Sequence, residues 1–123
     1  SNQLNEINFG DFEGLSFKMI EKEYEEEFQK MIKEGFEYKY PNGESLIDTF
    51  NRVGNEIEKI IKDNKDKTVL ICTHGGTIRN IISYLLCRDY KYHWNFRVDN
   101  ASITEIDVND NFAVINKMND TNY

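Results

Sequence analysis

The chain has 123 residues, which is enough for one domain over residues 1–123 built around one hydrophobic core. Its 22 acidic and 15 basic residues give a net charge of -7, which argues against binding to nucleic acid or to an anionic membrane. No apolar run approaches the ~20 residues of a membrane span, and no signal-like segment opens the chain. We therefore expect a cytoplasmic protein in which Cys72 and Cys87 are reduced.

Two amphipathic helices are expected in the first half of the chain. Ser16 is placed as the N-cap of the first, and Gly35 as the glycine that ends it. Ser45 and Asp48 have the spacing of a capping box and begin the second helix, which runs out in the polar stretch 62–67. The apolar stripe of the first helix is Ile20, Tyr24, Phe28, Met31 and Ile32.

The most informative stretch follows. The β-branched apolar run 68–73 predicts a strand buried on both faces, and His74 stands at its carboxyl end. Gly75 and Gly76 come next and open an amphipathic helix. Such an edge collects backbone N–H donors and the positive end of a helix dipole, and the glycines let an anion approach the backbone closely. We expect His74, Gly75 and Gly76 to form a phosphate site.

Other chemistries fit the sequence less well. Cys72 and Arg79 invite comparison with the loop of cysteine phosphatases, but six residues separate them instead of five, and Cys72 is expected in a buried strand. The two cysteines and two histidines have no zinc-ligand spacing. Neither a Walker motif nor a dinucleotide fingerprint is present. We therefore expect no metal and no cofactor.

Several candidates stay open at this stage. Glu6, Asp11 and Glu13 share a segment rich in glycine and aromatic residues, where a carboxyl group can be a general acid or simply solvated. Arg79 can contact an anion or pair with an acid, and a structural role is slightly favoured. The aromatic residues of the loop 90–94 can line a pocket or cover the core.

The last strands predict an incomplete sheet. Residues 101–108 and 112–116 are expected to pair as a hairpin through the turn at 109–111. Together with 68–73 this makes only three strands. A strand buried on both faces needs neighbours on each side.

Four segments, in this order along the chain, carry a resemblance to a known family: residues 4–14 (LNEINFGDFEG), 41–45 (PNGES), 73–76 (THGG) and 100–104 (NASIT). Together they resemble the histidine phosphatase superfamily, the phosphoglycerate mutase-like proteins. The resemblance implies a three-layer α/β/α fold in which Glu6 is the proton donor. It also implies that His74 is the second catalytic histidine, which holds the charge on the phosphoryl oxygens.

One family signature is absent from the sequence. The resemblance implies an Arg-His-Gly triplet upstream of the Glu6 segment, whose histidine is phosphorylated, but the only histidines are His74 and His93. We therefore expect a chain that lacks its N-terminal strand–helix units, so that its central sheet is incomplete. The exposed edge is expected to pair with a second copy or with the missing segment. By itself such a chain is expected to be inactive.

The resemblance favours hydrolysis of a small phosphomonoester, of the α-ribazole phosphatase type, through a phosphohistidine intermediate. Mutases of the family carry a longer insertion between the Glu6 and His74 motifs than this chain has. A phosphoglycerate mutase-type phosphoryl transfer is the first alternative. A catalytically dead phosphate-binding or dimerisation module is the second.

Overall fold

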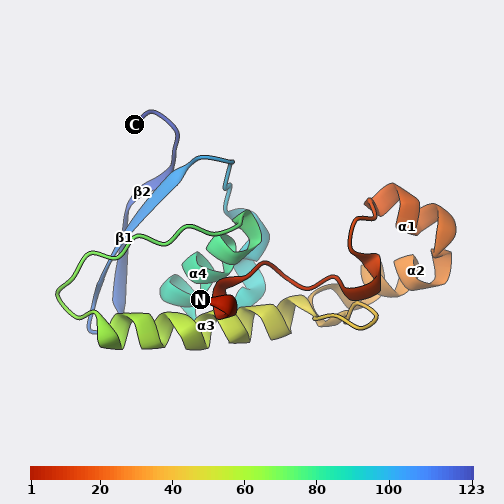
Figure 1. The fold of residues 1–123 in the computed structure, drawn as a ribbon, viewed down its shortest axis with the longest axis horizontal. Helices are drawn as coiled ribbons and strands as arrows, with labels where there is room; N and C mark the ends of the chain where they lie inside the picture. Colours follow the sequence, from red (N-terminus) through yellow and green to blue (C-terminus); the bar gives the residue numbers. More distant parts are fainter. The chain divides into compact units, whose positions relative to one another are not determined.

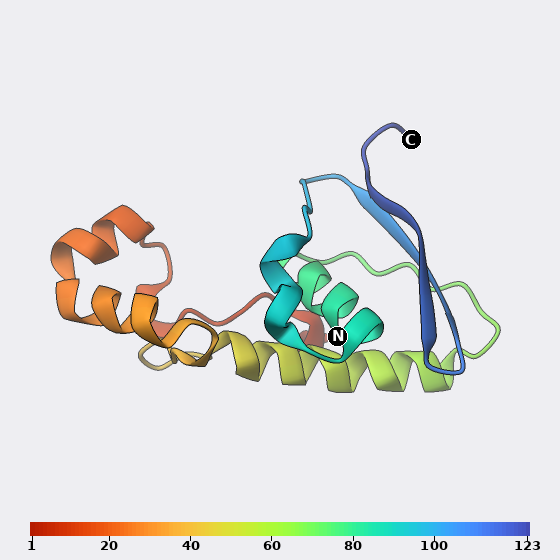
Figure 2. The same ribbon diagram turned by 180° about the vertical axis from the view of Figure 1, so that it is seen from behind.

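The computed structural model describes all residues from 1 to 123, and the chain forms two units. One holds residues 7–49, here the 7–49 unit, and the other holds residues 1–6 with residues 50–123, here the α4 unit. Helix α3, Leu46–Asp63, begins in the first and continues in the second. Figures 1 and 2 show the ribbon from opposite sides. None of the helices combines the length and the apolar character that crossing a membrane requires.

The 7–49 unit contains two short helices where the sequence predicts one. These are α1, Phe17–Glu23, and α2, Glu25–Glu34. Tyr24 separates them, because its backbone (φ -130°, ψ 53°) leaves the helical region while its ring packs 5.1 Å from the ring of Phe12. The prediction of one continuous helix is therefore wrong: the backbone leaves the helical region at Tyr24, where the side chain contacts a residue distant in the sequence.

The predicted helix ends are confirmed. The Ser16 hydroxyl accepts a hydrogen bond from the Met19 amide at 3.2 Å, and Gly35 ends α2 with a φ of 58° that favours glycine. At the start of α3 the capping box is complete. The Ser45 amide donates to Asp48 Oδ2 at 3.1 Å, and the Asp48 amide donates to Ser45 Oγ at 3.0 Å.

Aromatic residues build the core of the 7–49 unit. The rings of Tyr38 and Tyr40 meet edge to face at 5.0 Å. The Tyr38 hydroxyl donates to Glu27 at 2.7 Å, and burial together with this carboxylate raises the pKa of Tyr38. The buried apolar residues of this core are Ile7, Phe12, Ile20, Tyr38 and Tyr40.

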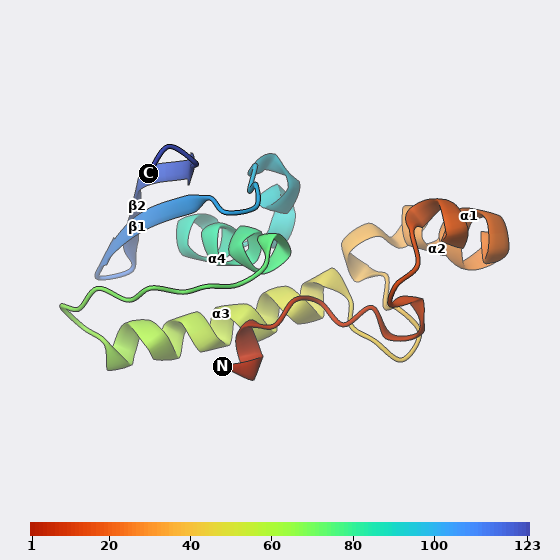
Figure 3. The same ribbon diagram turned by 45° about the horizontal axis from the view of Figure 1, so that its top comes forward.

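The core of the α4 unit lies where α3, helix α4 (Gly75–Cys87) and the N-terminal turn meet (Figure 3). Val53 of α3 is completely buried, and Leu4 of the N-terminal turn packs into the same cluster. The buried members of the cluster are Leu4, Val53, Ile57, Ile81 and Leu85. This packing fixes the N-terminal residues against the two helices.

A hairpin completes the α4 unit. Strands β1 (Ile103–Asn109) and β2 (Phe112–Asp120) pair antiparallel, with Asn109 opposite Phe112. Asp110 and Asn111 form the two-residue turn with φ angles of 48° and 68°, as the Asn/Asp-rich type I′ turn requires. The predicted hairpin is confirmed, and β2 is longer than predicted.

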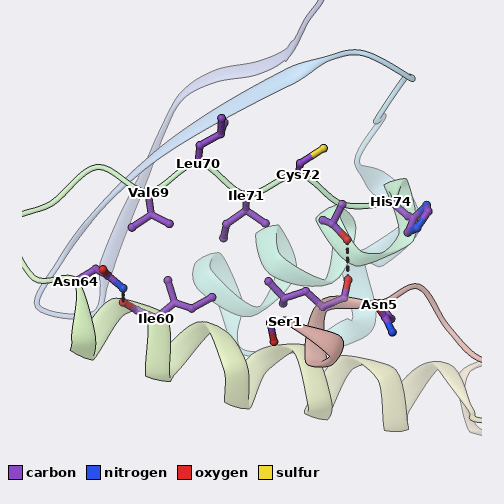
Figure 4. Close-up of a pocket in the computed structure, with 11 residues that line it drawn as sticks. Ser1, Asn5, Ile60, Asn64, Val69, Leu70, Ile71, Cys72 and His74 are labelled. Carbon is purple, nitrogen blue, oxygen red and sulfur yellow. Dashed lines mark hydrogen bonds between the residues drawn. The ribbon is translucent and has the colours of Figure 1, made fainter.

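The predicted buried strand at 68–73 does not form. These residues are extended, and Figure 4 shows Val69 and Ile71 directed toward the helices while Leu70 and Cys72 point away. Their backbone makes no hydrogen bond to another backbone segment, because the sheet consists only of β1 and β2. Leu70 is 91% exposed and Cys72 is exposed as well, so the prediction of burial is wrong.

We propose that this extended segment, residues 68–73, can pair with a second copy of the chain through its free backbone groups. Leu70→Lys is then expected to reduce self-association, because an inserted charge opposes strand pairing, whereas the monomer loses little from changing so exposed a side chain. Sedimentation velocity over a range of concentrations measures this. Phe17→Lys is the matched control, since Phe17 is 64% exposed on α1. Equal association of the two variants would contradict the proposed edge.

Candidate active site

The N-terminus of α4 is the focus of the candidate site. His74 occupies the N-cap position with extended backbone angles (φ -89°, ψ 160°), and its carbonyl accepts the first helical hydrogen bond from Ile78 at 2.9 Å. Its imidazole is exposed and does not cap the helix. In Figure 4 the ring lies at the end of the extended segment and points outward. The first-turn amides of α4 therefore need another acceptor.

Glu6 supplies that acceptor. The Gly76 amide donates to Glu6 Oε2 at 3.1 Å, and the Thr77 hydroxyl lies 3.4 Å from Glu6 Oε1. A carboxylate is favourable here because the first amides and the helix dipole are both positive. Glu6 and His74, both predicted from the sequence, are thus brought to one helix end. The amide of Gly76, expected to bind phosphate, holds this carboxylate instead, and its role toward phosphate stays a prediction.

Three hydrogen bonds from two side chains hold the backbone just before Glu6. Arg52 of α3 donates to the carbonyls of Gln3 at 2.7 Å and of Asn5 at 3.1 Å. The Thr73 hydroxyl donates to the Leu4 carbonyl at 2.7 Å. Successive carbonyls are therefore tied to different elements of the α4 unit, and Glu6 begins from a fixed backbone.

Gly76 is required by the position of Glu6. A Cβ on Gly76 would lie 2.5 Å from Glu6 Oε1 and 2.9 Å from Oε2, closer than atoms can approach. A Cβ on Gly75 would lie 3.4 Å from its nearest neighbour, Nη1 of Arg79, a contact that a flexible side chain can adjust. The two glycines therefore differ: a side chain at position 76, unlike one at position 75, would force the Glu6 carboxylate to shift.

The other two acids of the Glu6 segment have partners inside the 7–49 unit. Asp11 Oδ2 accepts from the Asn42 side chain at 2.9 Å, and Glu13 Oε1 accepts from the Phe9 amide at 2.8 Å. These bonds tie the loop that contains both acids to its own unit. Of the three acids that the sequence left open, Glu6 is the one whose carboxylate accepts a hydrogen bond from α4.

Arg79 and the loop after α4 form a second cluster in the α4 unit. Arg79 Nε donates to the Phe96 carbonyl at 2.9 Å, and its guanidinium lies 5.7 Å from the Trp94 ring. The favoured structural interpretation of Arg79 fits these contacts. His93 is buried with Nδ1 at 2.9 Å from Asn80 Oδ1, so this part of the aromatic loop covers the core, while Trp94 stays exposed.

Burial, followed by the nearby Arg79, lowers the pKa of His93 to about 4. The His93–Asn80 pair did not emerge from the sequence, because a histidine in an aromatic loop and an asparagine inside a helix give no spacing signal that links them.

An open groove of about 360 Å³ lies beside the site (Figure 4). The extended segment 69–74 forms one wall, and Leu4, Asn5, Ile60 and Asn64 form much of the other. His74 stands at one end of it. The structure brings no three His, Cys, Asp or Glu side chains together as a metal site.

Comparisons with known proteins show the family of this chain. The model of the histidine phosphatase superfamily (branch 1) matches residues 1–121. Phosphoserine phosphatase 1 of Hydrogenobacter thermophilus is 31% identical over 116 residues, which are 94% of this chain and 55% of that protein. The adenosylcobalamin/alpha-ribazole phosphatase of Escherichia coli is 27% identical over 118 residues, 95% of this chain and 58% of that protein.

Solved structures named as alpha-ribazole phosphatases also superpose on this chain. A candidate alpha-ribazole-5'-P phosphatase from Escherichia coli superposes with a TM-score of 0.88 at 26% identity. The alpha-ribazole phosphatase from Shigella flexneri superposes with a TM-score of 0.85 at 28% identity. Each match covers 96% of this chain and 58% of the other. This chain thus spans just over half the length of each of these four relatives.

The chain belongs to the histidine phosphatase superfamily. Its mixed α/β fold is phosphoglycerate mutase-like, as the sequence predicts, and the superposition confirms this class.

Gly76→Ala is expected to destabilise the protein, because the new methyl group must displace the Glu6 carboxylate. Gly75→Ala is expected to be neutral or slightly stabilising, since alanine favours a helix by up to about 1 kcal/mol over glycine. Urea unfolding of both variants, alone and combined with Glu6→Ala, measures the coupling. Glu6→Ala should remove most of the cost of Gly76→Ala. A cost that is the same in both backgrounds would show that Glu6 does not occupy this position.

The lowered pKa of His93 predicts a loss of stability in acid. In the unfolded chain His93 takes up a proton near pH 6.5, whereas in the folded chain it does so only near pH 4. The contribution of neutral His93 to the free energy of unfolding is therefore fully present above pH 6.5 and is lost as the pH falls from 6.5 to 4. The contribution is on the order of 2 kcal/mol, since one pKa unit equals about 1.4 kcal/mol and residual hydration reduces it. The stability difference between wild type and His93→Gln should shrink from pH 7 to 4.5. A constant difference would contradict a buried neutral His93.

Proposed function

We propose that the protein to which residues 1–123 belong hydrolyses a small phosphomonoester through a phosphohistidine intermediate. The observation that carries the proposal is the Glu6 carboxylate on the Gly76 amide, at the helix end that begins with His74. An acid and an imidazole beside a helix N-terminus are what an oxyanion with a basic leaving group needs. Family membership supports phosphate ester hydrolysis as the reaction class.

The first step of the proposed reaction forms a phosphorus–nitrogen bond. A histidine nitrogen attacks phosphorus while the bond to the leaving oxygen breaks, and Glu6 gives its proton to that oxygen. His74 donates hydrogen bonds to the equatorial phosphoryl oxygens, and the positive end of α4 adds to their stabilisation. In the second step Glu6, now ionised, takes a proton from water as the water oxygen attacks phosphorus. Inorganic phosphate leaves and the histidine is restored. The proposed steps use no metal or cofactor.

The nucleophile is proposed to lie outside residues 1–123. The chain has only two histidines. His93 is buried with its Nδ1 against Asn80, and His74 has the role of holding the phosphoryl oxygens. Residues 1–123 alone are therefore proposed to have no turnover. Activity of this chain alone that disappears in His74→Ala would instead make His74 the nucleophile.

The proposed substrate is a small organic phosphomonoester. The names of the relatives include phosphoserine phosphatase, alpha-ribazole phosphatase and fructose-2,6-bisphosphatase, whose substrates share a phosphate on a small hydroxyl compound. An α-ribazole phosphate-like ester is the substrate class that we favour.

Glu6→Gln in the full protein tests the central role. The variant should hydrolyse alkyl phosphates ~10²–10⁴-fold more slowly, because a basic alkoxide needs a proton to leave, and p-nitrophenyl phosphate much less so. His74→Ala should slow both substrates alike, because its proposed role is at phosphorus. Steady-state release of inorganic phosphate measures each rate. Equal losses for both leaving groups in Glu6→Gln would argue against a proton donor, and an isomeric phosphoester without free phosphate would identify a mutase.

A further inference from the structure

Thr77 is a side chain to which the sequence assigns no role. It lies in the first turn of α4 and is completely buried. Its hydroxyl oxygen is 3.2 Å from the Asn5 carbonyl and 3.4 Å from Glu6 Oε1. One hydroxyl group therefore faces two oxygens, and one of them belongs to the carboxyl group that the proposed reaction protonates and deprotonates.

The hydroxyl group can serve both forms of Glu6. A threonine hydroxyl has one proton to donate and two lone pairs that accept. When Glu6 is ionised, the hydroxyl can turn its proton toward Oε1. When Glu6 carries a proton on Oε1 and no substrate is bound, the hydroxyl can accept that proton's hydrogen bond and donate its own to the Asn5 carbonyl. Each arrangement leaves no donor facing another donor.

The Gly76 amide cannot do this. It is a donor only, and its acceptor is Glu6 Oε2 at 3.1 Å. An ionised carboxylate binds such a donor more strongly than a neutral carboxyl group does. The amide therefore holds the ionised form of Glu6 well and the protonated form less well. The protonated carboxyl group needs a partner that can accept a hydrogen bond from it.

We propose that Thr77 is a positioning residue that keeps the Glu6 carboxyl group in one place in both of its protonation states. The inference rests on the proposed function, because only a group that acts first as an acid and then as a base must keep its position through the change. If Thr77 merely tied the first turn of α4 to the Asn5 carbonyl, its loss would affect both states of Glu6 equally.

The direct test is an NMR measurement of the Glu6 side-chain rotamer in the full protein. The chemical shift of the Glu6 carboxyl carbon reports whether the group is ionised or protonated, and Hα–Hβ couplings are recorded in both states. Wild type and Thr77→Ser should show one rotamer on both sides. Thr77→Val, which keeps the shape but removes the hydroxyl, should keep one rotamer when Glu6 is ionised and average among rotamers when it is protonated. One rotamer in both states of Thr77→Val, or averaging in both, would overturn the proposal.

A kinetic measurement separates this inference from the proposed function. Thr77→Val should lower kcat for alkyl phosphates by about 10-fold or more with little change in KM, because a misplaced general acid costs rate and not binding. Thr77→Ser should retain the rate. Thr49→Val is the matched control, since Thr49 is also buried and its hydroxyl donates to the Ser45 carbonyl in α3. Equal losses of kcat in both valine variants would contradict a specific role of Thr77. A wild-type protein without phosphatase activity would contradict the proposed function, and the NMR measurement would still decide whether Thr77 positions Glu6.

Discussion

The hydrogen bond from the Gly76 amide to the Glu6 carboxylate is the interaction on which the site depends. It joins residues 70 positions apart and caps a helix whose own N-cap residue, His74, leaves its ring free. A conventional cap at His74 would satisfy the helix but occupy the side chain. Because Glu6 supplies the acceptor from elsewhere, the imidazole stays exposed at the helix end. The chemistry that we propose needs that freedom.

This arrangement requires a rigid support, and α4 provides it. The helix presents its N-terminus to Glu6, while its inner face buries Ile81 and Leu85 in the core and Asn80 against His93. The backbone before Glu6 is held from α3 by Arg52. A carboxyl group placed by loop contacts alone would move more easily, and a shift of about 1 Å can cost ~10²-fold in rate.

Local signals predicted much of the fold. The caps at Ser16 and Ser45, the helix after His74 and the turn at 110–111 follow from short-range chemistry and are confirmed. The extended segment 68–73 shows the limit. Its composition predicts a strand, but strand formation needs a hydrogen-bonding partner, and within residues 1–123 the two observed strands pair only with each other.

The sequence assigns Glu6 and His74 to the candidate site, and the structure brings both to one helix end, but the sequence does not predict their connections. Glu6 and His74 were found by motif, whereas the roles of Thr77 and Arg52 depend on which carbonyls lie nearby in the folded chain. Gly76 illustrates the difference. The sequence suggests a glycine that admits a phosphate, and the structure places a carboxylate of the same chain within 3.1 Å of its amide. Long-range pairing of this kind has no signature in a single sequence.

The most direct test of the account is a crystal structure of the full protein with vanadate, a mimic of the phosphoryl group in transfer. The account predicts vanadate at the N-terminus of α4, with its equatorial oxygens hydrogen-bonded to His74 and the Glu6 carboxyl group beside the apical oxygen of the leaving group. Vanadate bound elsewhere, or bound to His74 with Glu6 directed away from it, would contradict the assignment of these two residues to one site.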